Sequence, residues 1–440
     1  MKKLIVILIV LILLTGGGYW YFTFVRNAKQ VTDPNTPLTV KDFLPFGTGQ
    51  LLNPSPAQTA PEPNPTPENV NGESSFLPSK FHQITNFAVA GATFFEDIRP
   101  IIKTEKENPT VTTPPLNSTP TTKKQTAKTA TPAPPKEPEF EVASSIKYVE
   151  RSNGHIYQRY LDTNAEGKIS NTTIPSIYEA FFGNDSKSLI YRYLSSDGET
   201  ISSFLGTLGG SSGEFLTENI SSISISPDET RFFYLLPFGD GVAGIIKSFN
   251  DTKKTQIFTS AFTEWLTQWP NNKIIYLTTK ASASAVGYLY SLDTSSGAFK
   301  EVFGNVYGLT TLVSPNGNLV LYSYSTASGS KLAIFNIQTR DNLDLGLSGL
   351  SEKCVWGNDS LDIYCGIPNT ISGNQPDSWY QGLTSFNDGF VKINPTASQN
   401  STIAESPVNI DAINLFLDNK KGALFFVNKK DSTLWSLDLR

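Results

Sequence analysis

Few side chains in this 440-residue chain are of the kinds that catalyse reactions or bind metals. The chain has 2 His and 2 Cys, too few for a zinc ribbon or an iron–sulfur cluster held by four thiolates. The segment GGSSG at 209–213 formally matches the G-x-S-x-G nucleophile motif, which needs a strand-to-helix turn and a later histidine. Both histidines, His82 and His155, precede it. We therefore assign no catalytic residue, no metal site and no cofactor.

The two cysteines are placed to form a disulfide. Cys354 and Cys365 flank a hairpin turn centred on Asp359. Pairing Trp356 with Ile363 places the cysteines directly opposite each other, where Cβ atoms lie about 4.5–5.5 Å apart. A modest local adjustment then allows the bond, and an exported location permits oxidation. We predict the disulfide, with two buried free thiols as the alternative.

Residues 1–26 are predicted to be a membrane anchor. Two lysines precede an apolar run from Leu4 to Leu14, and the apolar stretch continues through an aromatic group to Arg26. A helix over 4–25 would span about 33 Å, enough for a hydrocarbon core of about 30 Å. The alternative is a cleaved signal peptide, although no A-x-A-type cleavage site precedes Arg26. We expect a single-pass protein of the cytoplasmic membrane, with the N-terminus inside and the remainder outside.

Two segments rich in proline follow the anchor. Residues 27–75 and 98–139 cannot bury enough apolar surface to fold, and we predict a disordered stalk and a disordered insert, respectively. Between them, residues 76–97 are too apolar and too β-prone for a linker. We expect this segment to form two strands that pair with later parts of the chain.

The rest of the chain repeats one pattern, in which an apolar strand, a polar turn and an aromatic-bearing strand follow each other. The second turn residues are spaced by 43, 43, 45, 43 and 60 residues. A third strand follows each hairpin, and a fourth follows most of them. Four short strands in about 43 residues are typical of a β-propeller blade. The second turn residues are Asp185, Asp228, Asn271, Asn316, Asp359 and Asn419.

Two of these repeats carry a more specific signature. The segments SPDETRFFYL (226–235) and SPNGNLVLYSY (314–324), with a later LYSLDTSSG, resemble the TolB-like (WD40-like, PD40) propeller repeat. That pattern has a Ser-Pro-Asp-Gly turn, and this chain departs from it at Glu229, where Gly is usual. The resemblance covers roughly residues 140–440. It implies a propeller from a family that mainly mediates protein contacts.

The six visible repeats can be extended to seven. Residues 145–173 supply three strands of a further blade, and AVAGATFF (88–95) supplies its inner strand, with Glu96-Asp97 as the turn. KFHQIT (80–85) would complete the last blade, which removes an open sheet edge and closes the ring. We predict an all-β, seven-bladed propeller of four-stranded antiparallel blades over 76–440, with eight or six blades as alternatives.

One repeat is longer than the others and holds the candidate binding residues. The extra length, residues 369–388, lies between the second and third strands, on the face that usually carries propeller ligands. Asp377, Trp379, Tyr380 and Gln381 combine stacking faces with polar groups, which suits a peptide or a sugar ring. The alternative is that Trp379 and Tyr380 fold back and cover the channel mouth or a blade edge.

The function predicted from these features is non-catalytic. Lys and Arg number 35 against 40 Asp and Glu, which argues against nucleic acid as a partner. We expect a membrane-anchored extracytoplasmic scaffold that binds a protein, a peptide or an envelope glycan. The alternatives are a glycan- or peptide-active hydrolase or lyase with acids in the central channel, and a purely structural part of a larger assembly.

Overall fold

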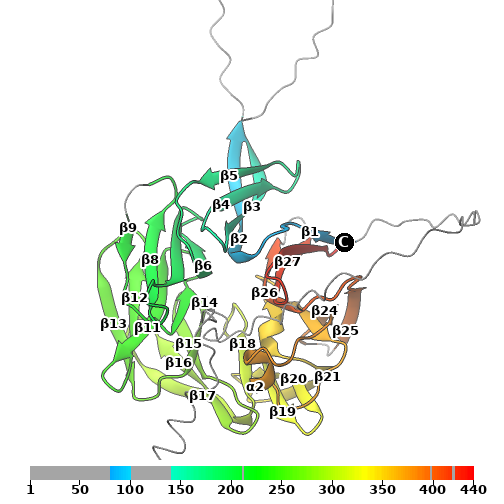
Figure 1. Ribbon diagram of the computed structural model, residues 1–440. Coiled ribbons are helices and arrows are strands. Elements are labelled where there is room, and N and C mark those ends of the chain that lie inside the picture. The colour runs from blue at the N-terminus through cyan, green and yellow to red at the C-terminus, as the bar shows by residue number, and fades with distance from the viewer. Residues whose placement is uncertain (1–79, 101–139, 211–212, 397–398, 419–421) are drawn as a thin grey trace, which may run out of the picture. The chain divides into compact units, whose positions relative to one another are not determined.

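The structure, a computed structural model, describes residues 80–100, 140–210, 213–396, 399–418 and 422–440. These residues form seven four-stranded antiparallel sheets, arranged as blades of a ring (Figure 1). The seven-bladed all-β propeller is therefore confirmed. The predicted anchor and stalk lie outside the described residues. Within the part that is described, no helix has the length and apolar character needed to cross a membrane.

Each blade runs from an inner strand to an outer strand in chain order, except the last. Blade 1 contains β2 (Val89–Pro100), β3 (Phe140–Glu150), β4 (Ile156–Tyr160) and β5 (Glu166–Ser170). Blade 2 contains β6 (Ile177–Gly183), β7 (Ser188–Leu194), β8 (Ile201–Thr207) and β9 (Gly213–Phe215). Blade 3 contains β10 (Ser222–Ile225), β11 (Arg231–Phe238), β12 (Gly241–Ser248) and β13 (Lys254–Ser260). Blade 4 contains β14 (Trp265–Asn271), β15 (Ile274–Thr279), β16 (Val286–Asp293) and β17 (Phe299–Tyr307).

The remaining three blades close the ring. Blade 5 contains β18 (Thr310–Val313), β19 (Leu319–Thr326), β20 (Gly329–Asn336) and β21 (Asn342–Ser348). Blade 6 contains β22 (Cys354–Trp356), β23 (Ile363–Pro368), β24 (Asp388–Asn394) and β25 (Gln399–Glu405). Blade 7 contains β26 (Ala412–Asp418), β27 (Ala423–Asn428), β28 (Leu434–Asp438) and β1 (Phe81–Gln83). Two short helices, η4 (Ser351–Lys353) and α2 (Asp377–Tyr380), interrupt the strand pattern.

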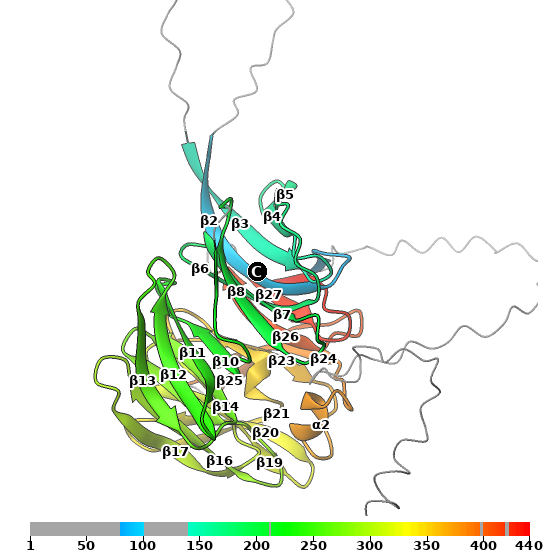
Figure 2. The same cartoon turned by 60° about the vertical axis from the view of Figure 1, so that its left-hand side comes forward.

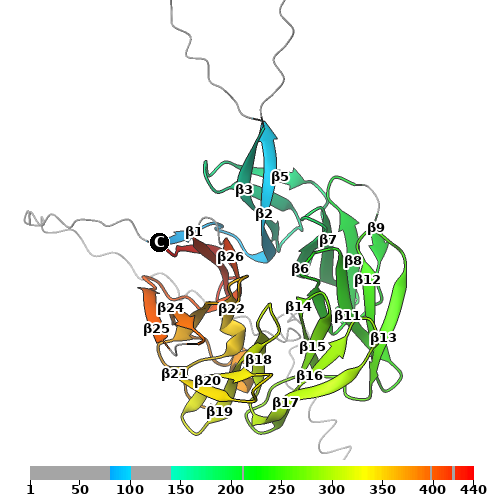
Figure 3. The ribbon, with the colours of Figure 1, turned by 180° about the vertical axis from the view of Figure 1, so that it is seen from behind.

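The first strand of the propeller completes its last blade, as predicted. β1 pairs antiparallel with β28, with Phe81 opposite Leu437. Phe81 also packs against Phe390 of blade 6, at a centroid distance of 5.5 Å. The pairing covers the edge of β28, which would otherwise present unpaired backbone groups. Figure 3 shows β1 beside blade 7, from behind the ring.

A buried apolar cluster lies at each of the seven blade-to-blade interfaces of the described residues. Each blade is apolar on both faces because it packs between two neighbours, so its strands read as runs of Phe, Tyr, Ile, Leu and Val. Between blades 3 and 4, for example, Phe233 and Leu277 pack with Trp265. Burial of these faces holds the ring together.

The hairpin turns follow the chemistry predicted from the sequence. Asp228 accepts hydrogen bonds from Ser226 Oγ at 2.6 Å and from Thr230 N at 3.1 Å. Glu229 has a φ of +54°, and Gly317 has a φ of +73° in the equivalent turn of blade 5. Glu229 therefore adopts the left-handed conformation for which the repeat normally uses Gly.

The predicted turn at Glu96-Asp97 is wrong. β2 continues to Pro100, with Glu96 opposite Ser144 and Asp97 opposite Ala143. Residues 98–100 thus belong to the strand and not to the insert. The carboxylate of Asp97 is accommodated in the strand because Gln158 and Tyr160 of β4 donate hydrogen bonds to it, at 2.8 and 2.9 Å. Figure 2 shows β2 and β3 extending together beyond β4 and β5.

The predicted disulfide is confirmed. Cys354 and Cys365 lie opposite each other in β22 and β23, and their sulfur atoms are bonded. The Cα atoms are 4.1 Å apart. Both residues belong to the apolar cluster between blades 5 and 6, with Trp356 and Ile363 as neighbours. The bond therefore fixes the inner hairpin of blade 6, directly after η4.

Candidate functional site

The long insertion of blade 6, predicted over residues 369–388, connects β23 to β24. Because Asp388 is the first residue of β24, we define the capping loop as residues 369–387. Its centre is the single turn of α2. Asp377, Trp379 and Tyr380 lie on α2, and Gln381 follows directly. Figure 2 shows α2 at one face of the ring, beside the loops of blades 5 and 6.

Blades 4, 5 and 7 all bind the capping loop. The carboxylate of Asp377 accepts a hydrogen bond of 2.7 Å from the backbone N–H of Ala283, between β15 and β16. Ser325, in β19, donates a hydrogen bond of 2.6 Å to the backbone carbonyl of Gln375. Lys429, directly after β27, donates from Nζ to the carbonyl of Trp379. The loop is therefore fixed to several blades at once.

Trp379 and Tyr380 fold back onto the propeller, as in the alternative interpretation of the sequence. Trp379 is 5% exposed and packs with Leu350 and Phe386. Its indole N–H donates to Asp411, 3.1 Å from Oδ2. The ring also lies 4.2 Å from the Nζ of Lys429, measured to its centroid. Trp379 therefore presents no open face for a ligand to stack upon.

The other predicted binding residues differ in exposure. Tyr380 is half-buried, and its hydroxyl donates to both carboxylate oxygens of Glu352, at 2.8 and 2.9 Å. Asp377 is half-buried as well, whereas Gln381 is exposed. The geometry accordingly assigns Trp379 and Tyr380 to holding the loop in place.

Three charged residues beneath the capping loop, Lys353, Asp388 and Asp411, form a cluster that we call the buried triad. The side chains of all three have no exposed surface. Lys353 Nζ lies 2.9 Å from Asp388 Oδ2, contacts Asp411 Oδ1, and donates to the carbonyl of Ala412 at 3.0 Å. Sequence reasoning missed this cluster, because Lys and Asp are usually exposed and no motif marks these positions.

The pKa values of the two aspartates are shifted in opposite directions. Burial raises the pKa of Asp388, despite the adjacent ammonium of Lys353. Burial also acts to raise the pKa of Asp411, but Lys353 and the donors Phe386 N and Trp379 Nε1 outweigh it and hold that pKa below its usual value. The triad thus contains two carboxyl groups of different proton affinity around one amine.

Two further titratable side chains, Glu352 and Lys429, interact electrostatically with Lys353 of the triad. Burial raises the pKa of Glu352 to about 7, although the Tyr380 hydroxyl and Lys429 oppose the shift. Burial lowers the pKa of Lys429 to about 8. Both groups therefore titrate much closer to neutrality than such side chains do in water.

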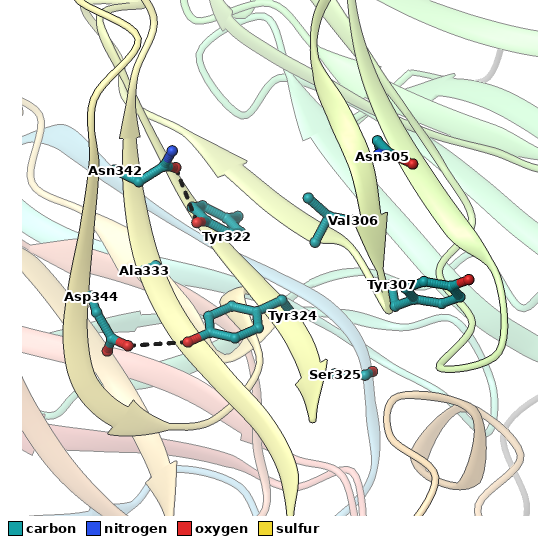
Figure 4. A pocket seen from close by; sticks show the side chains of 9 residues that line it. All are labelled: Asn305, Val306, Tyr307, Tyr322, Tyr324, Ser325, Ala333, Asn342 and Asp344. Carbon is teal, nitrogen blue, oxygen red and sulfur yellow. Dashed lines mark hydrogen bonds between the residues drawn. The ribbon is translucent and has the colours of Figure 1, made fainter. Parts of the chain in front are cut away.

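An open cavity lies beside the capping loop, between blades 4 and 5. Its volume is about 450 Å³. Figure 4 shows residues of β17 on one side and residues of β19 and β21 on the other. We call it the tyrosine groove; it is lined by Asn305, Val306, Tyr307, Tyr322, Tyr324, Ser325, Ala333, Asn342 and Asp344.

The tyrosine groove combines aromatic rings with fixed polar groups. The Tyr322 hydroxyl donates to Asn342 at 3.1 Å, and the Tyr324 hydroxyl donates to Asp344 at 3.1 Å. Burial raises the pKa of Tyr322 to about 12, so its phenol stays neutral at physiological pH. Tyr307 is 55% exposed on the opposite side. Aromatic faces next to amide and carboxylate oxygens suit a sugar ring or an extended peptide.

The sequence contained only part of the signal for this groove. Tyr322 is the aromatic residue of the second strand in its repeat (314–324), but every repeat has an aromatic residue there, so the pattern does not indicate a cavity. Tyr307 follows at the end of an outer strand, where its exposure depends on the neighbouring blade. Among the residues that the structure describes, no group of three or more His, Cys, Asp or Glu side chains is placed to hold a metal ion.

These features define the class of the protein as a seven-bladed β-propeller, closed by its first strand, with a capped face and an adjacent tyrosine groove. No family model matches the sequence, and no curated protein matches it either. Solved structures do match, at low identity. TolB from Acinetobacter baumannii is 12% identical over 65% of this chain, with a TM-score of 0.37, and the match covers 60% of TolB.

Two further structures illustrate the range of propellers that match. An oligogalacturonate lyase in complex with manganese is 10% identical, with 67% of this chain and 86% of that chain covered and a TM-score of 0.48. The β-propeller domain of the trilobed protease from Pyrococcus furiosus is 13% identical, with 68% and 92% covered and a TM-score of 0.45. TolB and a protease propeller are thus among the solved structures that match this chain.

Proposed function

We propose that this protein is a membrane-anchored, extracytoplasmic binding module that holds a protein, a peptide or an envelope glycan in the tyrosine groove without chemical conversion. The observation that carries the proposal is the groove itself, which places Tyr307 of blade 4 opposite Tyr324 of blade 5 and also includes the amide of Asn342 and the carboxylate of Asp344 in its lining. Rigid strands hold these side chains, so little conformational entropy is lost on binding.

The capping loop supports this assignment because it is bound to one residue that lines the groove. Ser325 lines the groove and also donates to Gln375 of the loop. Asp377 binds the N–H of Ala283, so the loop is tied to blade 4 as well. In this proposal Trp379 and Tyr380 hold the capping loop against the propeller. Gln381 is the predicted binding residue that is exposed and that a partner can reach.

The alternative function is a glycan- or peptide-active hydrolase or lyase. It requires carboxyl groups that a substrate can reach, commonly as a pair. Asp388 and Asp411 are such a pair, but both are fully buried and share Lys353. Their burial under the capping loop favours the binding function.

The membrane anchor and the outward orientation are part of the same proposal. They rest on the basic and apolar pattern of residues 1–26 and on the proline-rich character of 27–75. The disulfide between Cys354 and Cys365 supports an oxidising compartment, because disulfides are rare in the cytosol.

The test is a binding screen with the full chain in detergent micelles against arrays of defined peptides and envelope glycans. We expect a Tyr307→Ala/Tyr324→Ala variant to lose the ligands that the unaltered protein retains. Phe238→Ala is the matched control, because Phe238 is an aromatic residue of blade 3 that is 58% exposed. Equal binding by the groove variant would overturn the assignment of the groove, and turnover of a glycan or peptide would favour the enzyme.

A further inference from the structure

The buried triad brings a primary amine and a carboxyl group together in a site closed to water. Lys353 comes from η4, at the entry to blade 6, and Asp411 immediately precedes β26 of blade 7. The Nζ of Lys353 contacts Asp411 Oδ1, and the two residues are 58 positions apart. Amide formation from an amine and a carboxylic acid is favoured where water is excluded and both groups are held in contact.

The second oxygen of the Asp411 carboxyl group is surrounded by hydrogen-bond donors. Trp379 Nε1 lies 3.1 Å from Oδ2, the backbone N of Phe386 lies 3.0 Å from it, and Ser385 Oγ lies 3.3 Å from it. Donors fixed in this way stabilise negative charge that develops on a carbonyl oxygen during nucleophilic attack. Oδ1, on the amine side, is the oxygen that can leave.

Asp388 is placed to move protons between the two groups. Its Oδ2 lies 2.9 Å from Lys353 Nζ and accepts a hydrogen bond of 2.6 Å from the N–H of Ala412. Its Oδ1 is buried, and within the described part of the chain it has no hydrogen-bond partner. The raised pKa of Asp388 agrees with a group that takes up and releases a proton in this site.

The surroundings of the amine are aromatic. The Nζ of Lys353 lies 5.4 Å from the ring centroid of Trp379 and 5.5 Å from that of Phe386. These two rings are stacked at a centroid distance of 6.3 Å. These rings, together with the absence of exposed surface on the three triad side chains, keep bulk water away from Nζ.

From this geometry we propose that Lys353 and Asp411 are joined by an intramolecular amide bond, with Asp388 as the proton carrier. The ammonium of Lys353 first gives one proton to Oδ2 of Asp388, the carboxylate of the triad whose pKa is raised. The free electron pair of Nζ then attacks Cγ of Asp411, the N–C bond forms, and the C=O electron pair moves to Oδ2 of Asp411.

The reaction is completed within the triad. Protonated Asp388 gives its proton to Oδ1 of Asp411, which becomes a hydroxyl. The Asp388 carboxylate then takes a proton from the attacking nitrogen and delivers it to this hydroxyl. The Cγ–Oδ1 bond breaks, one water molecule leaves, and the carbonyl re-forms at Oδ2. Asp388 returns to its starting state, and the reaction requires no oxidant, metal or cofactor.

The crosslink ties two neighbouring blades together. The disulfide at Cys354, the residue after Lys353, fixes only the hairpin within blade 6. The amide adds a connection from blade 6 to blade 7, the blade that β1 closes. Unlike a disulfide, an amide bond is not broken by reducing agents.

The experiment is mass spectrometry of the purified, disulfide-bonded full chain. We expect a mass below that of the sequence by one water molecule, in addition to the two hydrogens lost to the disulfide. After reduction, alkylation and digestion with trypsin, we expect no cleavage after Lys353. Residues 341–392 should instead appear as one peptide linked to residues 393–420, since Arg340, Lys392 and Lys420 bound these segments.

The same digest contains an internal control. Lys247 is a lysine whose side chain is 1% exposed and which pairs with Glu214 at 3.2 Å, but Glu214 is itself 34% exposed. We expect normal cleavage after Lys247. An unshifted mass with cleavage after Lys353 would overturn the proposal and leave the triad as a buried ion cluster.

Two variants locate the bond. Lys353→Arg should restore the missing water mass, and a loss that persists in this variant would also overturn the proposal. Asp388→Asn should leave both reacting groups in place but abolish or strongly slow the crosslink. Its circular dichroism spectrum, compared with that of the unaltered protein, shows whether the fold is retained.

Discussion

The hydroxyl of Ser325 donates a hydrogen bond of 2.6 Å to the backbone carbonyl of Gln375, and this contact joins the tyrosine groove to the capping loop. Ser325 lies in blade 5, whereas Gln375 belongs to the insertion of blade 6. The loop also covers the buried triad through Trp379. We therefore expect a substitution in the buried triad to affect Ser325, which lines the tyrosine groove, through the capping loop.

Truncation of Trp379, which anchors the capping loop, should cost more stability than a substitution at an exposed position of the same loop. Trp379→Ala removes a buried indole and its hydrogen bond to Asp411, and we expect a loss of about 3–5 kcal/mol in the free energy of unfolding. Gln381→Ala, at an exposed position two residues later, should stay within about 0.5 kcal/mol of the unaltered protein. Denaturant unfolding, followed by intrinsic fluorescence, measures both. If the Trp379→Ala protein were as stable as the unaltered protein but no longer bound its ligand, Trp379 would instead be a residue of the binding surface.

Stability should fall as the pH rises from about 4.5 to about 7, because of Glu352. Its pKa is raised to about 7 in the folded state, so between these values the folded protein keeps a proton that the unfolded chain has released. The stabilising contribution is complete below the unfolded pKa and is lost as the pH passes the folded one. Glu352→Gln should remove this part of the slope, as measured by thermal unfolding at a series of pH values.

Lys429 should make the stability rise with pH, in a range above that of Glu352. Its pKa is lowered to about 8, so from there to about 10.5 the unfolded chain binds more protons than the folded one, and stability rises with pH. The comparison for Glu352 is therefore confined to pH 5–7. An unchanged slope in Glu352→Gln over that range would exclude Glu352 as its source.

Loss of the disulfide should destabilise the inner hairpin of blade 6. Cys354 and Cys365 are separated by 11 positions, and a loop of that size contributes about 2–3 kcal/mol by restricting the unfolded chain. A Cys354→Ala/Cys365→Ala variant should therefore unfold at lower denaturant concentration than the oxidised protein. Chemical reduction of the unaltered protein is the matched comparison, and the absence of any shift in both would mean that the hairpin is held by packing alone.

The blade count and the ring closure could be predicted because their signals are local. Each turn is specified by Asn, Asp or Gly within a few residues of its strands, and β1 and β2 stood out as apolar segments between proline-rich ones. The register of β22 and β23 followed from the same turn, and it located the disulfide. Local pattern is sufficient wherever the partner strand is the next one in the chain.

The features that the sequence did not predict depend on contacts with residues far along the chain. Asp97 reads as a turn residue, but Gln158 stabilises it within a strand from 61 positions away. The buried triad joins Lys353 to Asp411 across 58 positions. The exposure of Trp379 was likewise decided by Asp411, which no nearby residue indicated. Lys353, Asp388 and Asp411 are of types normally found at the surface, and they are buried here because they satisfy one another's charge.

The closeness of blades 1 and 2 gives a final prediction, at Gly91 of β2. A Cβ atom at this position would lie 2.1 Å from the backbone carbonyl oxygen of Ala180 in β6, and neither backbone can move without separating the blades. We expect Gly91→Ala to destabilise the protein by about 1–3 kcal/mol, through overpacking. Gly167→Ala is the matched control in β5 of the same blade, because a Cβ there meets nothing within 4 Å and should be neutral or slightly stabilising. If thermal unfolding gave the two variants equal midpoints, the inner strands of blades 1 and 2 would have to lie further apart than the structure places them.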